Sequence, residues 1–466
     1  MNKSYLIYIF KIIVALSKIA VLSFSTRYIS TELWGLFQKI LLIFLICIPI
    51  IESGLSSSFY YFFVNEKKTK IVFGSHSLLL LIYSFCLILI SSVYFVLFDI
   101  SFIHFPFLIL YILSSTLVIL FDCYFYALKK TKYIVISTLF IGILYSLSIF
   151  LFSYLSLSIN TLFVLLSLPS LIIFLIYAYI LKQKFRINLF YYKETKLLDF
   201  FNYGFPVSIA SLVGVLNRKI DILFVSYTLS LSTIAIYSFG SYEIPLIAIV
   251  TNVLFSQSSP KLHELSKNNK EVVNLWKTLQ RVSYIFICPL FITVFYFSNP
   301  LFLAVFSSKY QESIPIFQVF LLLIPLRTTN FGILLRIINK TKFITISSFI
   351  SLGFNLTFIY LFYSYFGLIG LSISVVASIY ILAFFQLYFY VNQTKISFKN
   401  FFDYKFLLLM TITLVLTNII FDYVFEKTNI NNIFIKVSFT MIFGFVILLT
   451  NKTLRTDFKN YYLNYE

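Results

Sequence analysis

The chain of 466 residues is 60% hydrophobic and only 11% charged. No soluble protein needs so much apolar surface, whereas lipid-facing helices do, so the composition excludes a soluble globular fold and predicts an all-α polytopic membrane protein. The net charge of +19 comes from basic residues in short gaps between apolar blocks, which is the pattern of cytoplasmic loops and argues against nucleic-acid binding.

The apolar blocks predict about fourteen transmembrane helices. The first block, Tyr5–Ser25, contains Lys11 and Lys18 and has no small-residue cleavage site, so we expect a retained helix instead of a signal peptide. Several blocks exceed the roughly twenty residues that cross a bilayer, so tilted or broken helices are expected. In chain order the predicted spans are 5–26, 34–63, 71–98, 105–127, 133–155, 159–181, 201–228, 232–255, 277–298, 313–335, 343–365, 367–391, 405–425 and 432–450.

Lys and Arg are distributed unevenly over the predicted loops. With the N-terminus in the cytoplasm, 26 basic residues lie in or beside the loops on that side, and four lie outside. The positive-inside rule then predicts that both termini are cytoplasmic. An even number of spans follows as well, because losing one span would invert every later loop.

Two pairs of similar segments indicate an internal repeat. KKTKYIVIS (Lys129–Ser137) resembles NKTKFITIS (Asn339–Ser347), and STELWGLF (Ser30–Phe37) resembles STIAIYSF (Ser232–Phe239). Each pair is six predicted spans apart, which predicts two parallel six-helix repeats around a central cavity, followed by two extra helices. Chance similarity in so biased a composition is the alternative. The predicted parts are 1–181 (first bundle), 182–200 (cytoplasmic linker), 201–391 (second bundle) and 392–466 (extra helices and tail).

Motifs for catalysis are scarce. The three histidines, His76, His104 and His263, belong to no HExxH motif, and the chain has neither a GxSxG motif nor a Walker glycine loop. We therefore predict a membrane transporter without catalytic residues, metal or cofactor. A glycan polymerase or ligase, which can use sparse Arg and His, is the alternative from another class, although every predicted outside loop is short. Four cysteines lie in apolar blocks without CxxC spacing: Cys47, Cys86, Cys123 and Cys288.

Nine of the charged residues inside the predicted spans form the informative set. Each costs roughly 2.5–3.5 kcal/mol on insertion scales, so it is kept only where protein or water surrounds it. Most lie at matching places in the two repeats, which predicts a substrate site between the repeats near the middle of the membrane. The excess of cations suits an anion such as a phosphate or pyrophosphate. The predicted cavity cations are Lys11, Lys18, Lys39, Arg218, Lys219 and Arg327, and the possible coupling or structural acids are Glu52, Asp221 and Glu243.

Structural explanations for these charges stay open. Arg218 and Asp221 are three residues apart on one helix and can pair. The lysines of the first two spans can extend to the interface, and the acids of the second and eighth spans can be partners of the cations. Arg327, which follows Pro325 near the middle of its span, is hardest to explain in this way. Six prolines inside spans predict bends: Pro49, Pro169, Pro206, Pro245, Pro289 and Pro325.

Several segments occur together in one order along the chain: RYISTELWG (Arg27–Gly35), ESGLSSSF (Glu52–Phe59), the stretch Tyr203–Phe239, Pro260, FSSKYQESIPIFQVF (Phe306–Phe320) and GLIGLSISV (Gly367–Val375). In this set the sequence resembles the polysaccharide transport family of the multidrug/oligosaccharidyl-lipid/polysaccharide (MOP) exporter superfamily, and specifically its O-antigen flippases of the Wzx type. The resemblance covers most of the chain.

The resemblance implies two six-helix bundles around a cationic cavity that opens alternately to each side. It implies transport of an undecaprenyl-pyrophosphate-linked oligosaccharide from the cytoplasmic to the periplasmic leaflet of a bacterial inner membrane. The family's cavity cations correspond loosely to Lys18, Arg218 and Arg327. The expected partners are this substrate and membrane lipids, together with a polysaccharide polymerase and a chain-length regulator.

Two further transporter classes are alternatives. A lipid II flippase would share fourteen spans and a cationic cavity. A multidrug exporter of the same superfamily would need an acidic cavity for cationic drugs, against which the excess of cations argues. For the predicted glycan flippase we expect coupling to a proton or sodium gradient through one of the intramembrane carboxylates.

Overall fold

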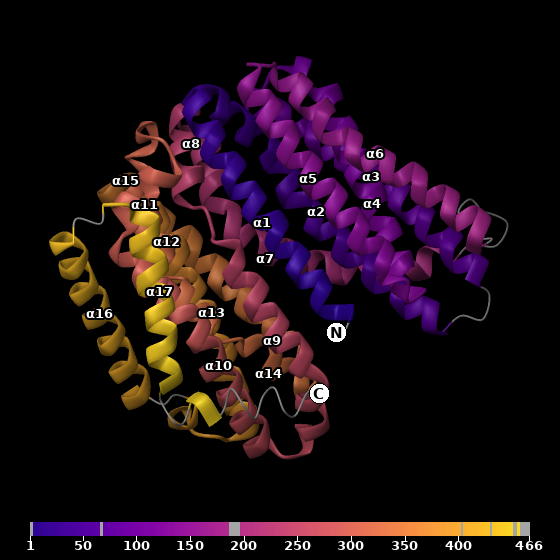
Figure 1. Cartoon of the computed structure of the whole chain (residues 1–466). Coiled ribbons are helices and arrows are strands. Elements are labelled where there is room, and N and C mark those ends of the chain that lie inside the picture. Colours follow the sequence, from indigo (N-terminus) through magenta and orange to yellow (C-terminus); the bar gives the residue numbers. More distant parts are fainter. Residues whose placement is uncertain are drawn as a thin grey trace. The chain divides into compact units, whose positions relative to one another are not determined.

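The computed structural model describes residues 3–65, 69–185, 196–401, 404–428, 431–450 and 454–456. Every regular element in these ranges is a helix, as Figure 1 shows. The contacts divide the chain into two compact units, Met1–Ser238 and Phe239–Glu466, which we call unit 1 and unit 2. The predicted division into bundles at 1–181 and 201–391 stays a prediction.

Unit 1 is built from long apolar helices joined by short turns. The predicted linker between the bundles falls largely on residues 186–195, which lie outside the described residues. The last helix, α8, begins in unit 1 and ends in unit 2. The elements are α1 (Lys3–Tyr28), α2 (Thr31–Asn65), α3 (Thr69–Leu97), η1 (Phe102–His104), α4 (Phe105–Ala127), α5 (Thr131–Tyr154), α6 (Ile159–Phe185), α7 (Leu197–Thr228) and α8 (Leu231–Gly240).

Unit 2 contains more interrupted helices. Pro245 and Pro325 each stand at the first turn of a helix, where a missing N–H is tolerated, so these two prolines start helices instead of bending them. The elements are α9 (Pro245–Glu264), η2 (Leu265–Lys267), α10 (Asn269–Tyr296), α11 (Ser298–Val305), η3 (Ser308–Tyr310), α12 (Ser313–Leu321), α13 (Ile324–Arg327), α14 (Phe331–Ile337), α15 (Lys342–Thr394), η4 (Phe398–Asn400), α16 (Tyr404–Lys427) and α17 (Ile433–Thr450).

The helices account for the predicted spans. Ten helical segments of the described residues are long and apolar enough to cross a membrane. One of them, α15, contains two predicted spans, and it bends at Gly367, whose φ of 55° is open to glycine but strained for other residues. Helices α1, α7 and the α8–α9 pair coincide with the remaining predicted spans. The chain is therefore a multi-pass membrane protein.

A second predicted span, besides the one divided between α8 and α9, is not a single helix. Over 313–335 the chain forms three short helices, α12, α13 and α14, with residues 328–330 between the last two. Such breaks are tolerated at membrane depth where protein or water surrounds the freed backbone groups. The expectation of broken helices thus applies to unit 2.

In unit 1, α2 and α7 pack closely and antiparallel. A methyl group added to Gly204 of α7 would lie 2.7 Å from the Gly54 oxygen of α2, and one added to Gly35 of α2 would overlap the carbonyl oxygen of Leu231, the first residue of α8. Ser208 and Ser211 of α7 donate hydrogen bonds to the carbonyls of Ile50 and Pro49, at 3.1 and 3.2 Å. Small residues allow such backbone approach between membrane helices. Two of the family-like segments, ESGLSSSF and the one that begins at Tyr203, are therefore contact surfaces.

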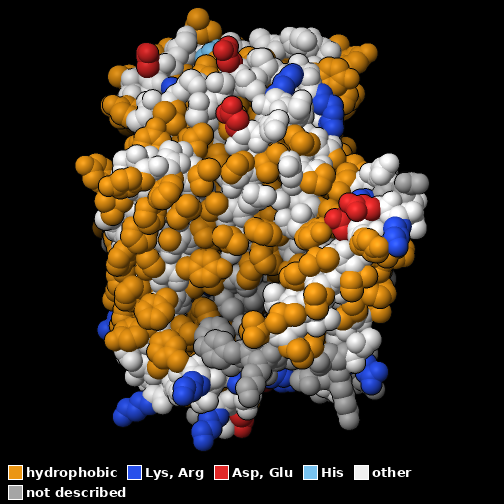
Figure 2. Space-filling model, turned by 90° about the vertical axis from the view of Figure 1, so that its left-hand side faces the viewer, with side chains coloured by type: hydrophobic (Ala, Val, Ile, Leu, Met, Phe, Trp, Pro, Cys, Tyr) orange, Lys and Arg blue, Asp and Glu red, His pale blue; other side chains and the backbone are white. Residues whose placement is uncertain are grey.

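The outer surface of the helices is apolar. In Figure 2, hydrophobic side chains cover most of the displayed face, and Lys and Arg side chains gather at its lower edge. The exposed residues of α16 recur every three or four positions, as expected for one face of a helix turned toward lipid. They include Leu409, Ile412, Leu416, Ile419 and Tyr423.

Candidate functional site

The predicted site residues fall into both units. Unit 1 holds the residues of α1, α2 and α7, and unit 2 holds Glu243 and Arg327. Lys11 lies in α1, but its side chain is outside the described residues. Because the two units are separate bodies, the geometry is given for each unit by itself.

On α7 the three predicted charges have different surroundings. Arg218 is exposed, and its Nη1 lies 3.8 Å from the position that a Cβ on Gly214 would take, so the guanidinium extends back along the helix. Lys219 is partly buried. Asp221 is only 2% exposed, and its Oδ2 accepts a 2.6 Å hydrogen bond from the Tyr237 hydroxyl of α8. Asp221 thus joins α7 to α8 through Tyr237, and the predicted pairing of Asp221 with Arg218 stays a prediction.

The remaining charges of unit 1 lie on α1 and α2. Lys18 is exposed and Lys39 is partly buried, and neither forms an ion pair with any described residue. Asp99, just beyond the end of α3, interacts electrostatically with Lys39. This proximity fits the alternative in which Lys39 reaches toward an interface. Glu52 is exposed on α2, two residues before the glycine that contacts α7.

In unit 2 the structure brings two predicted residues together. Arg327 Nη2 donates to Glu243 Oε2 over 2.6 Å, and both side chains keep part of their surface exposed, 37% and 52%. Each residue stands at a helix break, Glu243 between α8 and α9 and Arg327 at the end of α13. The pairing places Glu243 as the partner of Arg327, an option that residue spacing could not decide.

Arg327 also lines a cavity of about 220 Å³ between α9, α13, α14 and α15, which we call the polar cavity. Its polar lining comes from Thr251, Thr329, Asn330 and Gln386, none of which the sequence analysis singled out. The signal was present: RTTN (Arg327–Asn330) is a polar run inside an apolar block, and Gln386 is a lone amide in another. The prediction of the site rests on charged residues and therefore omits these uncharged ones.

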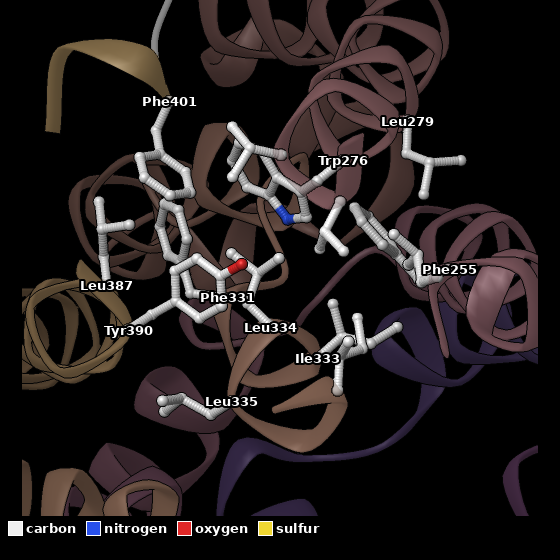
Figure 3. Close-up of a cluster of buried hydrophobic side chains, with 14 of the residues drawn as sticks. Phe255, Trp276, Leu279, Phe331, Ile333, Leu334, Leu335, Leu387, Tyr390 and Phe401 are labelled. Atoms are coloured by element: carbon white, nitrogen blue, oxygen red, sulfur yellow. The ribbon is translucent and has the colours of Figure 1, made fainter. Parts of the chain in front are cut away.

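A second, larger cavity of about 540 Å³ lies against the same helix break, and we call it the apolar cavity. The two cavities share part of their lining, namely Leu326, Thr329, Phe331 and Ala383. Phe331 stacks on Trp276 with ring centroids 5.2 Å apart, inside the buried cluster shown in Figure 3. The helix break therefore rests on a well-packed core.

Metal sites in proteins are usually formed by several His, Cys, Asp or Glu side chains that lie close together. Across the described part of the chain, no group of three or more His, Cys, Asp or Glu side chains is arranged to hold a metal ion.

Comparisons with known proteins connect this architecture to transporters. A family model described as polysaccharide biosynthesis protein matches residues 26–315. The chain is similar in structure to the lipid II flippase MurJ in an inward closed conformation, with a TM-score of 0.69 and 17% identity over 95% of this chain and 98% of the other. It also resembles an inward-facing multidrug resistance MATE family transporter of the MOP superfamily, with a TM-score of 0.57 and 14% identity over 84% and 96% of the two chains.

A relative in sequence is an uncharacterized membrane protein of Methanocaldococcus jannaschii, 25% identical over 245 residues. The match spans about half of each protein, 50% of this chain and 48% of the relative. The structural likenesses establish the fold, and the family model covers more than half of the chain.

Proposed function

The chain belongs to the polysaccharide biosynthesis protein family and has the fold of MOP-superfamily transporters, and on that basis we propose that it is a flippase for a lipid-linked glycan. The substrate would be an undecaprenyl-pyrophosphate-linked oligosaccharide, such as an O-antigen repeat unit. It would move from the cytoplasmic to the periplasmic leaflet of a bacterial inner membrane. The observation that carries this proposal is the family match over residues 26–315.

The proposed mechanism assigns the charged residues to the head group. Exposed cations inside membrane helices, Arg218 on α7 and Lys18 on α1, attract the pyrophosphate. The sugars occupy water-filled space while the polyprenyl chain stays in lipid. Two alternative packings of the bundles then expose the head group first to one side and then to the other.

We also propose an orientation in the membrane, an energy source and partner proteins. Both termini lie in the cytoplasm, following the distribution of Lys and Arg, and the protein works as a transporter without its own catalytic step. A proton or sodium gradient supplies the energy through Glu52, Asp221 or Glu243. A polysaccharide polymerase and a chain-length regulator act on the delivered units.

A lipid II flippase is the second candidate function. The likeness to MurJ, over 95% of this chain, is the observation that favours it. Lipid II is also an undecaprenyl-pyrophosphate glycan, so both candidates require the same chemistry of recognition. They differ in whether loss of the gene affects a surface polysaccharide or the cell wall.

Deletion of the gene tests the proposed function. We expect undecaprenyl-pyrophosphate-linked oligosaccharide to accumulate on the cytoplasmic side, and the wild-type gene to reverse the accumulation. Arg218→Ala and Arg327→Ala, at normal protein levels, should fail to reverse it. The matched control is Arg336→Ala, an exposed arginine at the end of α14 that should restore transport fully.

Different outcomes separate the alternatives. If single units still reach the periplasm and only their polymerisation fails, the protein is a polymerase or ligase and the flippase proposal is wrong. Accumulation of lipid II, with an intact supply of other lipid-linked glycans, would favour the second candidate.

A further inference from the structure

The polar cavity of unit 2 has the lining of a site for a neutral, hydroxyl-rich molecule. Resting on the proposed function, we propose that this cavity binds one uncharged sugar residue of the transported glycan, with Asn330 and Gln386 as the residues that hydrogen-bond it. Its volume of about 220 Å³ gives room for a single sugar ring. Four observations support this assignment.

The first observation is that both amides are available. Asn330 is the N-cap residue of α14, a position where Asn normally caps the helix, yet its side chain makes no capping hydrogen bond. Neither the Asn330 nor the Gln386 side chain hydrogen-bonds any described residue, although both are partly buried. An amide supplies two donors and an acceptor, which matches neighbouring hydroxyl groups of a sugar.

The second observation is that the two amides converge. A Cβ placed on Gly332 would lie 3.4 Å from Gln386 Oε1 and 3.8 Å from Asn330 Oδ1. Both oxygens therefore surround the same small space, which a glycine keeps open. Two separate helices, α14 and α15, supply them, so one ligand can contact both.

The third observation concerns charge. Arg327 is the single charged residue among the described residues that line the polar cavity, and Glu243 already pairs with it at 2.6 Å. With that cation matched, the cavity offers no surplus positive charge for a pyrophosphate. A neutral polar ligand suits it better than a second anion, because a buried charge without a partner is costly.

The fourth observation is the apolar part of the cavity lining. Phe331 and aliphatic side chains of α13 and α15 complete the lining, so the cavity combines apolar surface with a few polar groups. Phe331 is 5% exposed and stacks on Trp276, which is fully buried. Sugar rings present C–H surface as well as hydroxyls, and a rigid apolar wall of this kind complements them.

A binding experiment on the full chain in lipid nanodiscs tests the assignment. The two probes are undecaprenyl pyrophosphate without sugar and the same carrier with the glycan that accumulates in the deletion strain. Wild type should bind the glycan-bearing probe more tightly. Asn330→Leu and Gln386→Leu should each weaken binding of that probe about tenfold, the size of one lost hydrogen bond, and leave the sugar-free probe unchanged.

Two further variants complete the design. Gly332→Val places a side chain between the two amides and should cause the same selective loss without removing either of them, which keeps the test valid if an amide variant fails to fold. Gln393→Leu, on the same helix as Gln386 but exposed and outside the lining, is the matched control and should bind both probes like wild type.

The outcomes distinguish this inference from the proposed function. If wild type binds both probes equally, or if the variants weaken both probes equally, the cavity is not a sugar site, while the flippase proposal stands. If wild type binds neither probe, the proposed function fails and the sugar site fails with it.

Discussion

The α2–α7 contact of unit 1 and the α12–α14 segment of unit 2 differ in how closely their helices pack. In the first, glycines and serines bring two continuous helices into backbone contact. In the second, three short helices leave a cavity of about 220 Å³ beside Arg327 and one of about 540 Å³ beside Leu326 and Thr329. The tight contact favours rigidity, and the broken segment leaves space for a ligand.

Gly35→Ala should lower the stability of the protein more than any other substitution proposed here. The added methyl would overlap the backbone carbonyl of Leu231, which cannot move away as a side chain could. We expect the free energy of unfolding to fall by roughly 3 kcal/mol or more, the upper range for overpacking. Thermal unfolding in detergent measures it. Gly353→Ala, with no atom within 4 Å of the new methyl, is the control and should leave stability unchanged or slightly higher.

An unchanged melting temperature for Gly35→Ala would show that α2 packs less closely in unit 1, where it meets the start of α8, than described. The contrast with the broken segment of unit 2 would then lose its basis.

Tyr237→Phe should cause the next largest loss. The substitution removes the hydrogen bond to Asp221, a carboxylate that is 2% exposed, and leaves Oδ2 without its donor. The free energy of unfolding should fall by about 1–3 kcal/mol, as for other buried charged groups that lose a partner. Chemical or thermal unfolding checks this against Tyr227→Phe, an exposed tyrosine of α7 that should behave like wild type. Equal stability of both variants would contradict a structural role for Asp221.

The double variant Ser208→Ala with Ser211→Ala should cause a smaller loss of stability, because it removes two hydrogen bonds between α7 and α2. Each serine donates to a carbonyl of α2, and hydrogen bonds between membrane helices average about 0.6 kcal/mol. The two changes together should lower the melting temperature slightly without loss of transport. A loss as large as that of Gly35→Ala would mean that the serines, and not the close backbone approach, hold the two helices together.

Glu243→Gln should have the smallest effect on stability. Its ion pair with Arg327 is partly exposed, and such pairs contribute about 0–1 kcal/mol. Transport should suffer far more than stability, since the change frees a cation beside the polar cavity. Comparing the melting temperature with complementation of the deletion strain separates the two effects. A large drop in melting temperature with normal transport would mean that the ion pair between Arg327 and Glu243 serves stability and not transport.

The sequence was a good guide to the positions of the helices. Hydrophobic blocks locate spans because burial in lipid depends on local composition, and the predicted boundary at 366 lies next to the bend at Gly367. Contacts between residues far apart in the chain could not be predicted from the sequence. Arg327 and Glu243 are separated by 84 residues, and their pairing depends on two helix breaks that local pattern does not locate.

The uncharged polar residues of the candidate site could not be predicted from the sequence either. Asn330 and Gln386 stand in apolar blocks, where a lone amide usually satisfies itself by packing or by a hydrogen bond to the backbone. Nothing local to either residue indicates that both face one cavity. Gly35 is similar, because a glycine in a helix shows its purpose only when the neighbouring backbone is known.

Reconstitution into proteoliposomes tests the central claim most directly. Vesicles would contain the pure protein and the lipid-linked glycan that accumulates in the deletion strain, and a membrane-impermeant periodate reagent would report how much glycan faces outward. We predict that wild type exposes nearly all of the glycan to the reagent over time, whereas Arg218→Ala vesicles stay near the half that protein-free vesicles expose. Wild-type vesicles that expose no more glycan than protein-free vesicles, with or without a proton or sodium gradient, would contradict the claim that this chain moves lipid-linked glycans across the membrane.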